Sequence, residues 1–122
     1  MFPDRTVLTV ETLGPRARLI RLGNDLDRGV ATEVDRLIDG QLDLARSGRC
    51  HITDLVIDVT AVGRFVPGGL ESLLATRDRA REQHVTVHVS GCAARAHRLP
   101  GYVREALTRF DPFLTATDLA HG

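Results

Sequence analysis

The sequence predicts one α/β domain over residues 1–122, with a mixed sheet of four or five strands and helices packed mainly on one face. Three observations predict this fold. A chain of 122 residues suits one domain with one hydrophobic core. Strand-like and helix-like segments alternate along most of the chain. The segment Leu55–Val59 is nearly all apolar and β-branched, which is typical of a central strand.

The chain begins with a predicted hairpin. Val7–Leu13 alternates weakly between apolar and polar residues, and Ala17–Leu22 alternates apolar residues with arginines. The turn signal Gly14-Pro15 lies between these two strands. Two neighbouring strands joined by so short a turn are expected to pair.

Two long amphipathic helices are predicted. Apolar residues recur at helical spacing over Val30–Arg46, and Ser47-Gly48 ends that pattern. The second helix covers Leu70–Gln83, directly after Pro67-Gly68-Gly69. The predicted core consists of Leu37, Ile38, Leu55, Ile57, Leu70, Leu73, Leu74 and Val87.

The last third of the chain is predicted to hold two strands and two shorter helices. Val85–Ser90 alternates valines with polar residues and therefore favours a strand with one apolar face. A short helix is expected over Ala93–Leu99 and another over Gly101–Phe110. Phe113–Thr117 is expected to add a final short strand.

Charge and residue usage narrow the function classes. Sixteen basic residues balance sixteen acidic ones, so no excess charge favours nucleic acid or an anionic membrane. All of the basic residues are arginines, which excludes Schiff-base chemistry and a P-loop lysine. No apolar run is long enough to span a membrane, and no signal peptide is recognised. Cys50 and Cys92 are too few for a disulfide scaffold, so we expect reduced thiols and a cytoplasmic protein.

No metal, cofactor or enzymatic activity is expected. His84, Thr86 and His88 are predicted to form the wetter face of a strand, and Cys92 follows without metal-ligand spacing. The sequence contains no nucleophile elbow, Walker motif or dinucleotide-binding motif.

Two groups of charged side chains have structural explanations. Asp25 and Asp27 are expected to organise a turn and cap a helix, although catalytic carboxylates also occupy such loops. The helix end around Arg77, Arg79 and Arg81 also carries acidic residues, so it is expected to be a solvated face.

Three segments, in order along the chain, carry a family resemblance. Leu22–Asp27 resembles a Gly-x-Leu-Asp turn, Leu55–Val62 an apolar strand ending in Asp-Leu-Ser-x-Val, and Gly69–Leu74 the Gly-Leu start of a helix. Together they resemble the STAS domain of bacterial anti-sigma-factor antagonists. The resemblance implies a STAS-like fold and a non-enzymatic role in regulating transcription.

The sequence departs from this family at its phosphorylation site. The family pattern is Asp-Ser-Ser/Thr-Gly-Leu, whose first Ser is phosphorylated by a partner kinase. Here Val66 stands at the Asp and Pro67 at the phosphoacceptor Ser, and residues 63–69 contain no hydroxyl group. The expectation is a domain without the usual phospho-switch.

The resemblance also implies a partner and a binding site. The partner would be an anti-sigma factor of the ATP-binding serine-kinase type, whose sequestration releases a sigma factor. The turn before the first helix and the segment before the second are expected to share an edge. The predicted partner-binding residues are Asp25, Asp27, Arg64, Phe65, Val66, Pro67, Gly68 and Gly69. Phe65 either forms the apolar centre of this surface or folds inward into the core.

Other functions stay open at this point. The same fold serves as a scaffold in a stress-signalling assembly or beside an ABC transporter. A small-ligand or nucleotide sensor is a further alternative, because a glycine-rich helix start can hold an anion. A homodimer is also possible.

Overall fold

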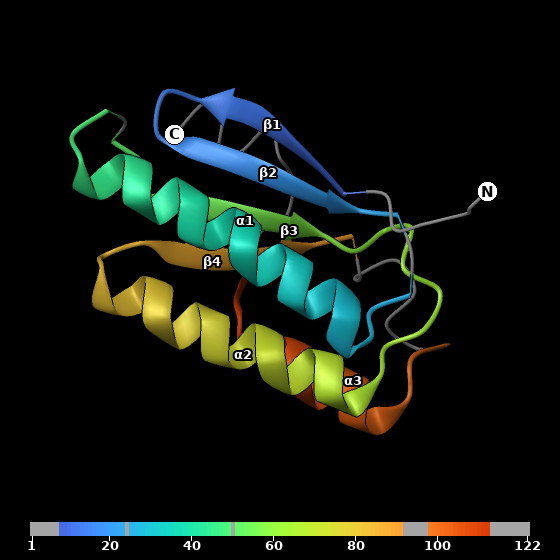
Figure 1. The fold of residues 1–122 in the computed structure, drawn as a ribbon. Coiled ribbons are helices and arrows are strands. Elements are labelled where there is room, and N and C mark those ends of the chain that lie inside the picture. Colours follow the sequence, from blue (N-terminus) through green and yellow to red (C-terminus); the bar gives the residue numbers. More distant parts are fainter. Residues whose placement is uncertain (1–7, 24, 50, 92–97, 113–122) are drawn as a thin grey trace.

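Five strands form one mixed sheet in the order β1-β2-β3-β4-β5 (Figure 1). The computed structural model describes residues 8–23, 25–49, 51–91 and 98–112. β1 (Leu8–Gly14) pairs antiparallel with β2 (Ala17–Leu22), which confirms the hairpin. β3 (Asp54–Asp58), β4 (Thr86–Ser90) and β5 (Asp111–Pro112) follow in parallel. The apolar β3 is the middle strand, as predicted.

Helices α1 (Arg28–Arg46) and α2 (Pro67–Glu82) lie side by side on one face of the sheet (Figure 1). The short α3 (Gly101–Leu107) lies beside α2 at the β5 side. The prediction of a mixed sheet with helices mainly on one face is confirmed.

The main core lies between the sheet and the two long helices. Six of the eight predicted core residues are buried there: Ile38, Leu55, Ile57, Leu70, Leu73 and Val87. Leu37 and Leu74 are partly buried and pack against the margin of the core. Each lies next to a buried residue of its helix, so its side chain points along the boundary rather than toward the sheet.

One helix boundary in the last third of the chain differs from the prediction. α3 ends at Leu107 rather than at Phe110, and the Thr108 hydroxyl donates to the Glu105 carbonyl in its last turn. The final described strand is Asp111–Pro112. The strand predicted over Phe113–Thr117 and most of the helix predicted over Ala93–Leu99 fall outside the described residues.

His84 is not on the strand, which corrects the prediction that it shares a face with Thr86 and His88. It follows α2 with a φ of 64°, in the left-handed region that often ends a helix. Its N–H donates to the Arg81 carbonyl, and the Val85 N–H donates to the Ala80 carbonyl. The helix end therefore uses His84 as its turn, and β4 begins two residues later.

The arginine-rich end of α2 is only partly a solvated face, because two of its arginines link helices. The Arg79 Nη2 lies 2.7 Å from Asp35 Oδ1 and 2.7 Å from Asp39 Oδ1, both on α1. The Arg77 side chain is 16% exposed, donates to the Arg109 carbonyl and lies 5.9 Å from the centre of the Phe110 ring. Arg81 is exposed as predicted.

The contact between α1 and α2 contains a polar cluster around Asp35. The Thr76 hydroxyl is buried and lies 2.6 Å from Asp35 Oδ1. Burial raises the pKa of Asp35, but hydrogen bonds from Arg79 and Thr76 and the charge of Arg79 outweigh burial. The pKa of Asp35 is therefore below its ordinary value, and the ion pair ties the two helices together.

Candidate partner-binding site

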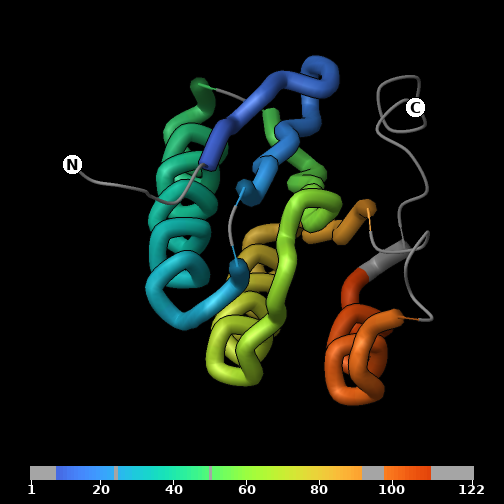
Figure 2. The backbone as a smooth tube through the Cα atoms, turned by 90° about the vertical axis from the view of Figure 1, so that its right-hand side faces the viewer, coloured from blue at the N-terminus to red at the C-terminus, as the bar shows by residue number. Residues whose placement is uncertain are grey.

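The starts of all three helices gather at one end of the molecule, the right-hand end in Figure 1. Figure 2 looks directly onto this end. Because β2, β3 and β4 run parallel toward it, the segments that enter α1 and α2 meet here. We call the surface formed by residues 25–28, residues 64–69 and Tyr102 the helix-start edge.

Two loops of the helix-start edge pair through their backbones. The Leu26 N–H donates to the Arg64 carbonyl at 2.8 Å, and the Val66 N–H donates to the Leu26 carbonyl at 2.8 Å. Leu26 and Phe65 thus form an isolated parallel bridge. The expectation that these two segments share one edge is confirmed.

Asp25 and Asp27 organise this edge, as predicted. Asp25 Oδ1 accepts from the Arg64 N–H at 3.0 Å and so fastens one loop to the other. Asp27 is the N-cap of α1, and its Oδ1 accepts from the Val30 N–H at 2.9 Å. Both residues are exposed.

Gly69 lets the two helix starts approach each other. A Cβ at this position would lie 2.7 Å from the Leu26 carbonyl oxygen and 2.9 Å from the Asp27 carbonyl oxygen. Both atoms belong to the backbone, so neither can rotate away. The backbone of α2 therefore packs directly against the segment that enters α1.

Gly68 lies under an arginine. A Cβ on Gly68 would be 3.2 Å from both Nε and Nη2 of Arg28, the first residue of α1. The guanidinium group therefore occupies the space that a side chain at position 68 would take. Arg28 was not among the predicted site residues, because only the tertiary structure brings it over α2.

Val66 and Pro67 begin α2 without a polar cap. Val66 is the N-cap, its extended backbone has a φ of −85°, and no side chain caps the helix. Pro67 occupies the first turn, a position in which its missing N–H costs nothing. Pro67 is exposed and Val66 is half-buried, so both contribute apolar surface.

Phe65 does not contribute its side chain to this surface, and its assignment to the binding residues is corrected. It is only 5% exposed and belongs to the core cluster. Side chains alternate along an extended segment, so Phe65 points inward while its neighbours Arg64 and Val66 point outward. Of the two alternatives, the structure shows the inward one.

Tyr102 on α3 completes the edge. Its hydroxyl donates to the Phe65 carbonyl at 2.7 Å, yet the residue is 48% exposed. Tyr102 was not predicted as a site residue. The sequence feature that points to it is the apolar stripe of Val103, Leu107 and Phe110, whose members are all buried. Tyr102 lies off this stripe, so an aromatic residue faces outward on a helix that buries its other side.

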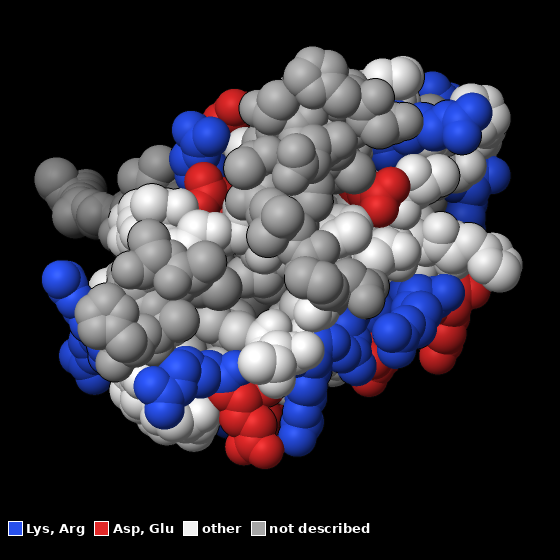
Figure 3. All heavy atoms as spheres, turned by 180° about the vertical axis from the view of Figure 1, so that it is seen from behind, with Lys and Arg blue, Asp and Glu red and all other residues white. Residues whose placement is uncertain are grey.

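No other part of the described chain forms a comparable site. No three His, Cys, Asp or Glu side chains gather to hold a metal within the described ranges. Cys50 and Cys92 lie outside those ranges, and Asp58 bonds to Thr60 and Arg21. Seen from behind, acidic and basic side chains are interspersed rather than gathered into one patch (Figure 3). None of the described helices is long and apolar enough to cross a bilayer.

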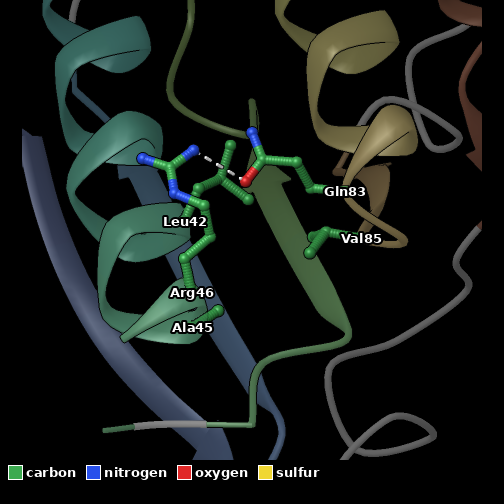
Figure 4. Close-up of a pocket in the computed structure, with 5 residues that line it drawn as sticks. All are labelled: Leu42, Ala45, Arg46, Gln83 and Val85. Carbon is green, nitrogen blue, oxygen red and sulfur yellow. Dashed lines mark hydrogen bonds between the residues drawn. The ribbon is translucent and has the colours of Figure 1, made fainter. Parts of the chain in front are cut away.

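A small open hollow of about 250 Å³ lies at the opposite end of the long helices (Figure 4). Its lining consists of Leu42, Ala45, Arg46, Gln83 and Val85. Arg46 Nη1 donates to Gln83 Oε1 at 2.9 Å, so a side-chain bond links α1 to the residue that caps α2. The hollow is remote from the helix-start edge and shares no residue with it.

The fold and the paired helix starts define a STAS-like domain, the fold of the anti-sigma factor antagonists. The unphosphorylated form of SpoIIAA shares 14% identity over 95% of this chain and 99% of its own, with a TM-score of 0.64. An anti-sigma factor antagonist from Mycobacterium paratuberculosis shares 21% identity over 99% of this chain and 98% of its own, with a TM-score of 0.65. Phosphorylated SpoIIAA, a Bacillus cell fate determinant, shares 13% identity over 94% and 96%, with a TM-score of 0.58.

The matches to known proteins come from the structure. The sequence matches no protein-family model and no curated protein. The structural neighbours are regulatory proteins. At these identities the likeness establishes the fold, and the function has to be argued from the helix-start edge.

Proposed function

We propose that this protein is a regulatory protein-binding domain of the anti-sigma-factor-antagonist type. Its partner is an anti-sigma factor with an ATP-binding serine-kinase fold, and its helix-start edge is the binding surface. Sequestering that partner releases a sigma factor and so regulates transcription in the bacterial cytoplasm. The observation that carries the proposal is the Leu26–Phe65 bridge, which joins two helix starts into one exposed surface.

The binding residues of this proposal are Asp25, Asp27, Arg64, Val66, Pro67 and Gly68, and the buried residues Phe65 and Gly69 support them from below. Their backbones are fastened to one another, so little conformational entropy is lost when a partner binds. Pro67 and Val66 offer apolar contact, and the charged residues surround them. An apolar centre with a charged rim is the usual construction of a protein interface.

We also propose that partner binding is not controlled by phosphorylation at the start of α2. Residues 63–69 contain no hydroxyl group. Of the two nearest hydroxyl residues, Thr60 bonds through its hydroxyl to Asp58 Oδ1 at 2.6 Å, and Ser72 lies half-buried within α2. The complex is therefore constitutive with respect to this switch.

A titration tests the proposal. Each serine-kinase-type anti-sigma factor encoded by the source organism is purified and titrated calorimetrically with this protein, in the presence of ADP and of ATP. We expect one of them to bind with micromolar or tighter affinity and to release its sigma factor. Absence of binding to all of them would overturn the proposal. Thermal stabilisation of the isolated protein by a nucleotide would point to the sensor alternative instead.

A further inference from the structure

We propose that Tyr102, Arg28 and Arg64 form a recognition surface for an acidic protein segment that carries an apolar side chain. The proposal rests on the proposed function because it uses the same edge of the molecule. It adds α3 to that edge and specifies the charge of the partner. The two claims can fail separately, and the experiments below distinguish their failures.

The first observation is the exposure of Tyr102. Among the described residues, only Val10 and Tyr102 are large apolar residues with an exposed surface, and Val10 lies on the outer strand β1. The Tyr102 hydroxyl already has its acceptor in the Phe65 carbonyl, 2.7 Å away. The ring is therefore held in place and needs nothing polar from a partner. A rigid, half-exposed aromatic ring is the side chain that most often anchors a protein interface.

The second observation is the pair of arginines on the same edge as Tyr102. Arg28 and Arg64 are both exposed, and neither side chain forms an ion pair in the part of the chain that the structure describes. By contrast, Arg21, Arg36, Arg46, Arg77 and Arg79 all pair with carboxylates. The two guanidinium groups of the edge are thus available to an incoming acceptor.

The third observation is that the acidic residues of the edge are already engaged. Asp25 Oδ1 accepts from the Arg64 backbone, and Asp27 Oδ1 caps α1. The charged groups of the edge that have no hydrogen-bond partner in the described part of the chain are therefore the two guanidinium groups. A partner with carboxylates satisfies them with charge-assisted hydrogen bonds, whereas a basic partner would place like charges together.

Short contacts, mostly of the backbone, place the three residues on one edge. Tyr102 is bonded to Phe65, which directly follows Arg64 in the chain. Phe65 is bridged to Leu26, two residues before Arg28. The Arg28 guanidinium is in turn held over Gly68, in the first turn of α2. The three residues consequently lie at the same end of the molecule, where the helices start.

Charge-reversal variants test this surface with the partner found in the titration above. Arg28→Glu and Arg64→Glu are each expected to weaken binding about tenfold or more, which corresponds to ~1.4 kcal/mol. Arg81→Glu is the matched control, because Arg81 is an exposed arginine at the other end of α2. It should change affinity less than about twofold, since exposed charges distant from an interface are screened. Arg28→Glu keeps the fold, because an acidic residue suits the first turn of α1.

Two substitutions of Tyr102 separate anchoring from positioning. Tyr102→Phe keeps the ring and removes only the bond to the Phe65 carbonyl, whereas Tyr102→Ala removes both. If the ring is the anchor, Tyr102→Ala should weaken binding about tenfold or more and Tyr102→Phe much less. Equal losses in the two variants would overturn the anchor role and leave Tyr102 as a positioning residue.

A peptide probe tests the surface without any natural partner. The ¹⁵N-labelled protein is titrated with a peptide of alternating Glu and Leu, and separately with one of alternating Arg and Leu. We expect only the acidic peptide to shift the amide signals of Arg28, Gly68 and Tyr102, with less effect at high salt. Shifts with both peptides, with neither, or only elsewhere would overturn the inference.

The combined outcomes distinguish the two proposals. If a kinase-type partner binds and its affinity is unchanged by Arg28→Glu and Arg64→Glu, the proposed function stands and this inference fails. If no kinase-type partner binds but the acidic peptide maps to these residues, the inference stands and the proposed function fails.

Discussion

Leu26 and Phe65 are 39 residues apart in sequence, yet their backbones form a parallel bridge that joins the entrances of α1 and α2. Both side chains are buried, so the bridge is fixed from below by the core. The residues on either side of each one, among them Asp25, Asp27 and Arg64, are exposed. One bridge therefore converts two separate loops into a single rigid surface.

Gly69→Ala is expected to destabilise the protein by ~1–3 kcal/mol, because the added methyl group collides with two backbone carbonyls. The Leu26 oxygen would lie 2.7 Å from it. Gly40→Ala is the matched control, since nothing lies within 4 Å of that position in the helix α1. It should stabilise the protein by ~0.5–1 kcal/mol through helix propensity. Denaturant melts measure both, and equal effects of the two variants would show that the helix starts are not in tight contact.

Leu73→Ala should cost ~2–5 kcal/mol of unfolding free energy, because it leaves a cavity in the core. Leu73 is completely buried in α2 against the sheet. Leu37→Ala in α1 provides the comparison, because Leu37 is only partly buried at the core margin and should cost clearly less. A loss below half a kcal/mol for Leu73→Ala would place this side chain outside the core.

Acid should weaken the contact between α1 and α2. The pKa of Asp35 is lower in the folded protein than in the unfolded chain, where it is about 3.9. Asp35 therefore contributes stability above the unfolded pKa, and this contribution is lost as the pH falls through the folded pKa. The hydrogen bond to Asp35 raises the pKa of Arg79, so Arg79 stays protonated at neutral and acidic pH. Its contribution to the stability of the folded protein therefore lasts as long as Asp35 is charged.

Asp35→Asn tests this coupling. The variant should be less stable than the parent protein at pH 7, and the difference should shrink as the pH falls below about 4. Glu82→Gln is the control, because Glu82 is exposed and forms no ion pair within the described ranges. A constant difference between Asp35→Asn and the parent from pH 7 to pH 2 would contradict the assignment.

Incubation with the partner and ATP should leave residues 63–69 unmodified. Mass spectrometry of proteolytic peptides measures this directly. Pro67→Ser places a hydroxyl at the family's acceptor position, and we expect this variant to accept one phosphate and to lose affinity for the partner. Stoichiometric phosphate on Thr60 or Ser72 of the parent protein would instead show that a neighbouring hydroxyl has assumed the role.

Gly68→Asp should weaken partner binding several-fold and leave the melting temperature nearly unchanged. The new carboxylate would lie beside Arg28, whose guanidinium is 3.2 Å from the Cβ position. It would therefore neutralise Arg28 within the molecule and add negative charge to the edge. Gly68→Ala adds volume without charge and should have the smaller effect. A large fall in melting temperature for Gly68→Asp would mean that the segment is structural, and an unchanged affinity would place the interface elsewhere.

Much of this protein follows from its sequence alone. The apolar run Leu55–Val59 predicts the middle strand, and the helical spacing of apolar residues predicts both long helices, because periodic burial is a local property of the chain. The absence of any hydroxyl group from residues 63–69 also follows directly from the sequence. The family resemblance and the order of the elements predict that the two helix-entry loops share one edge, whereas their backbone pairing is seen only in the structure.

Only the tertiary structure decided which side chains of the helix-start edge are exposed. Phe65 lies between Arg64 and Pro67 in the segment 63–69, but the bridge to Leu26 directs its side chain into the core. Arg28 lies over Gly68, and Tyr102 reaches the Phe65 carbonyl from a helix 37 residues further on. These contacts join residues far apart in the chain, so no local pattern encodes them. The physical reason is that periodicity determines which face of an element is buried, whereas the packing of elements determines which exposed residues meet.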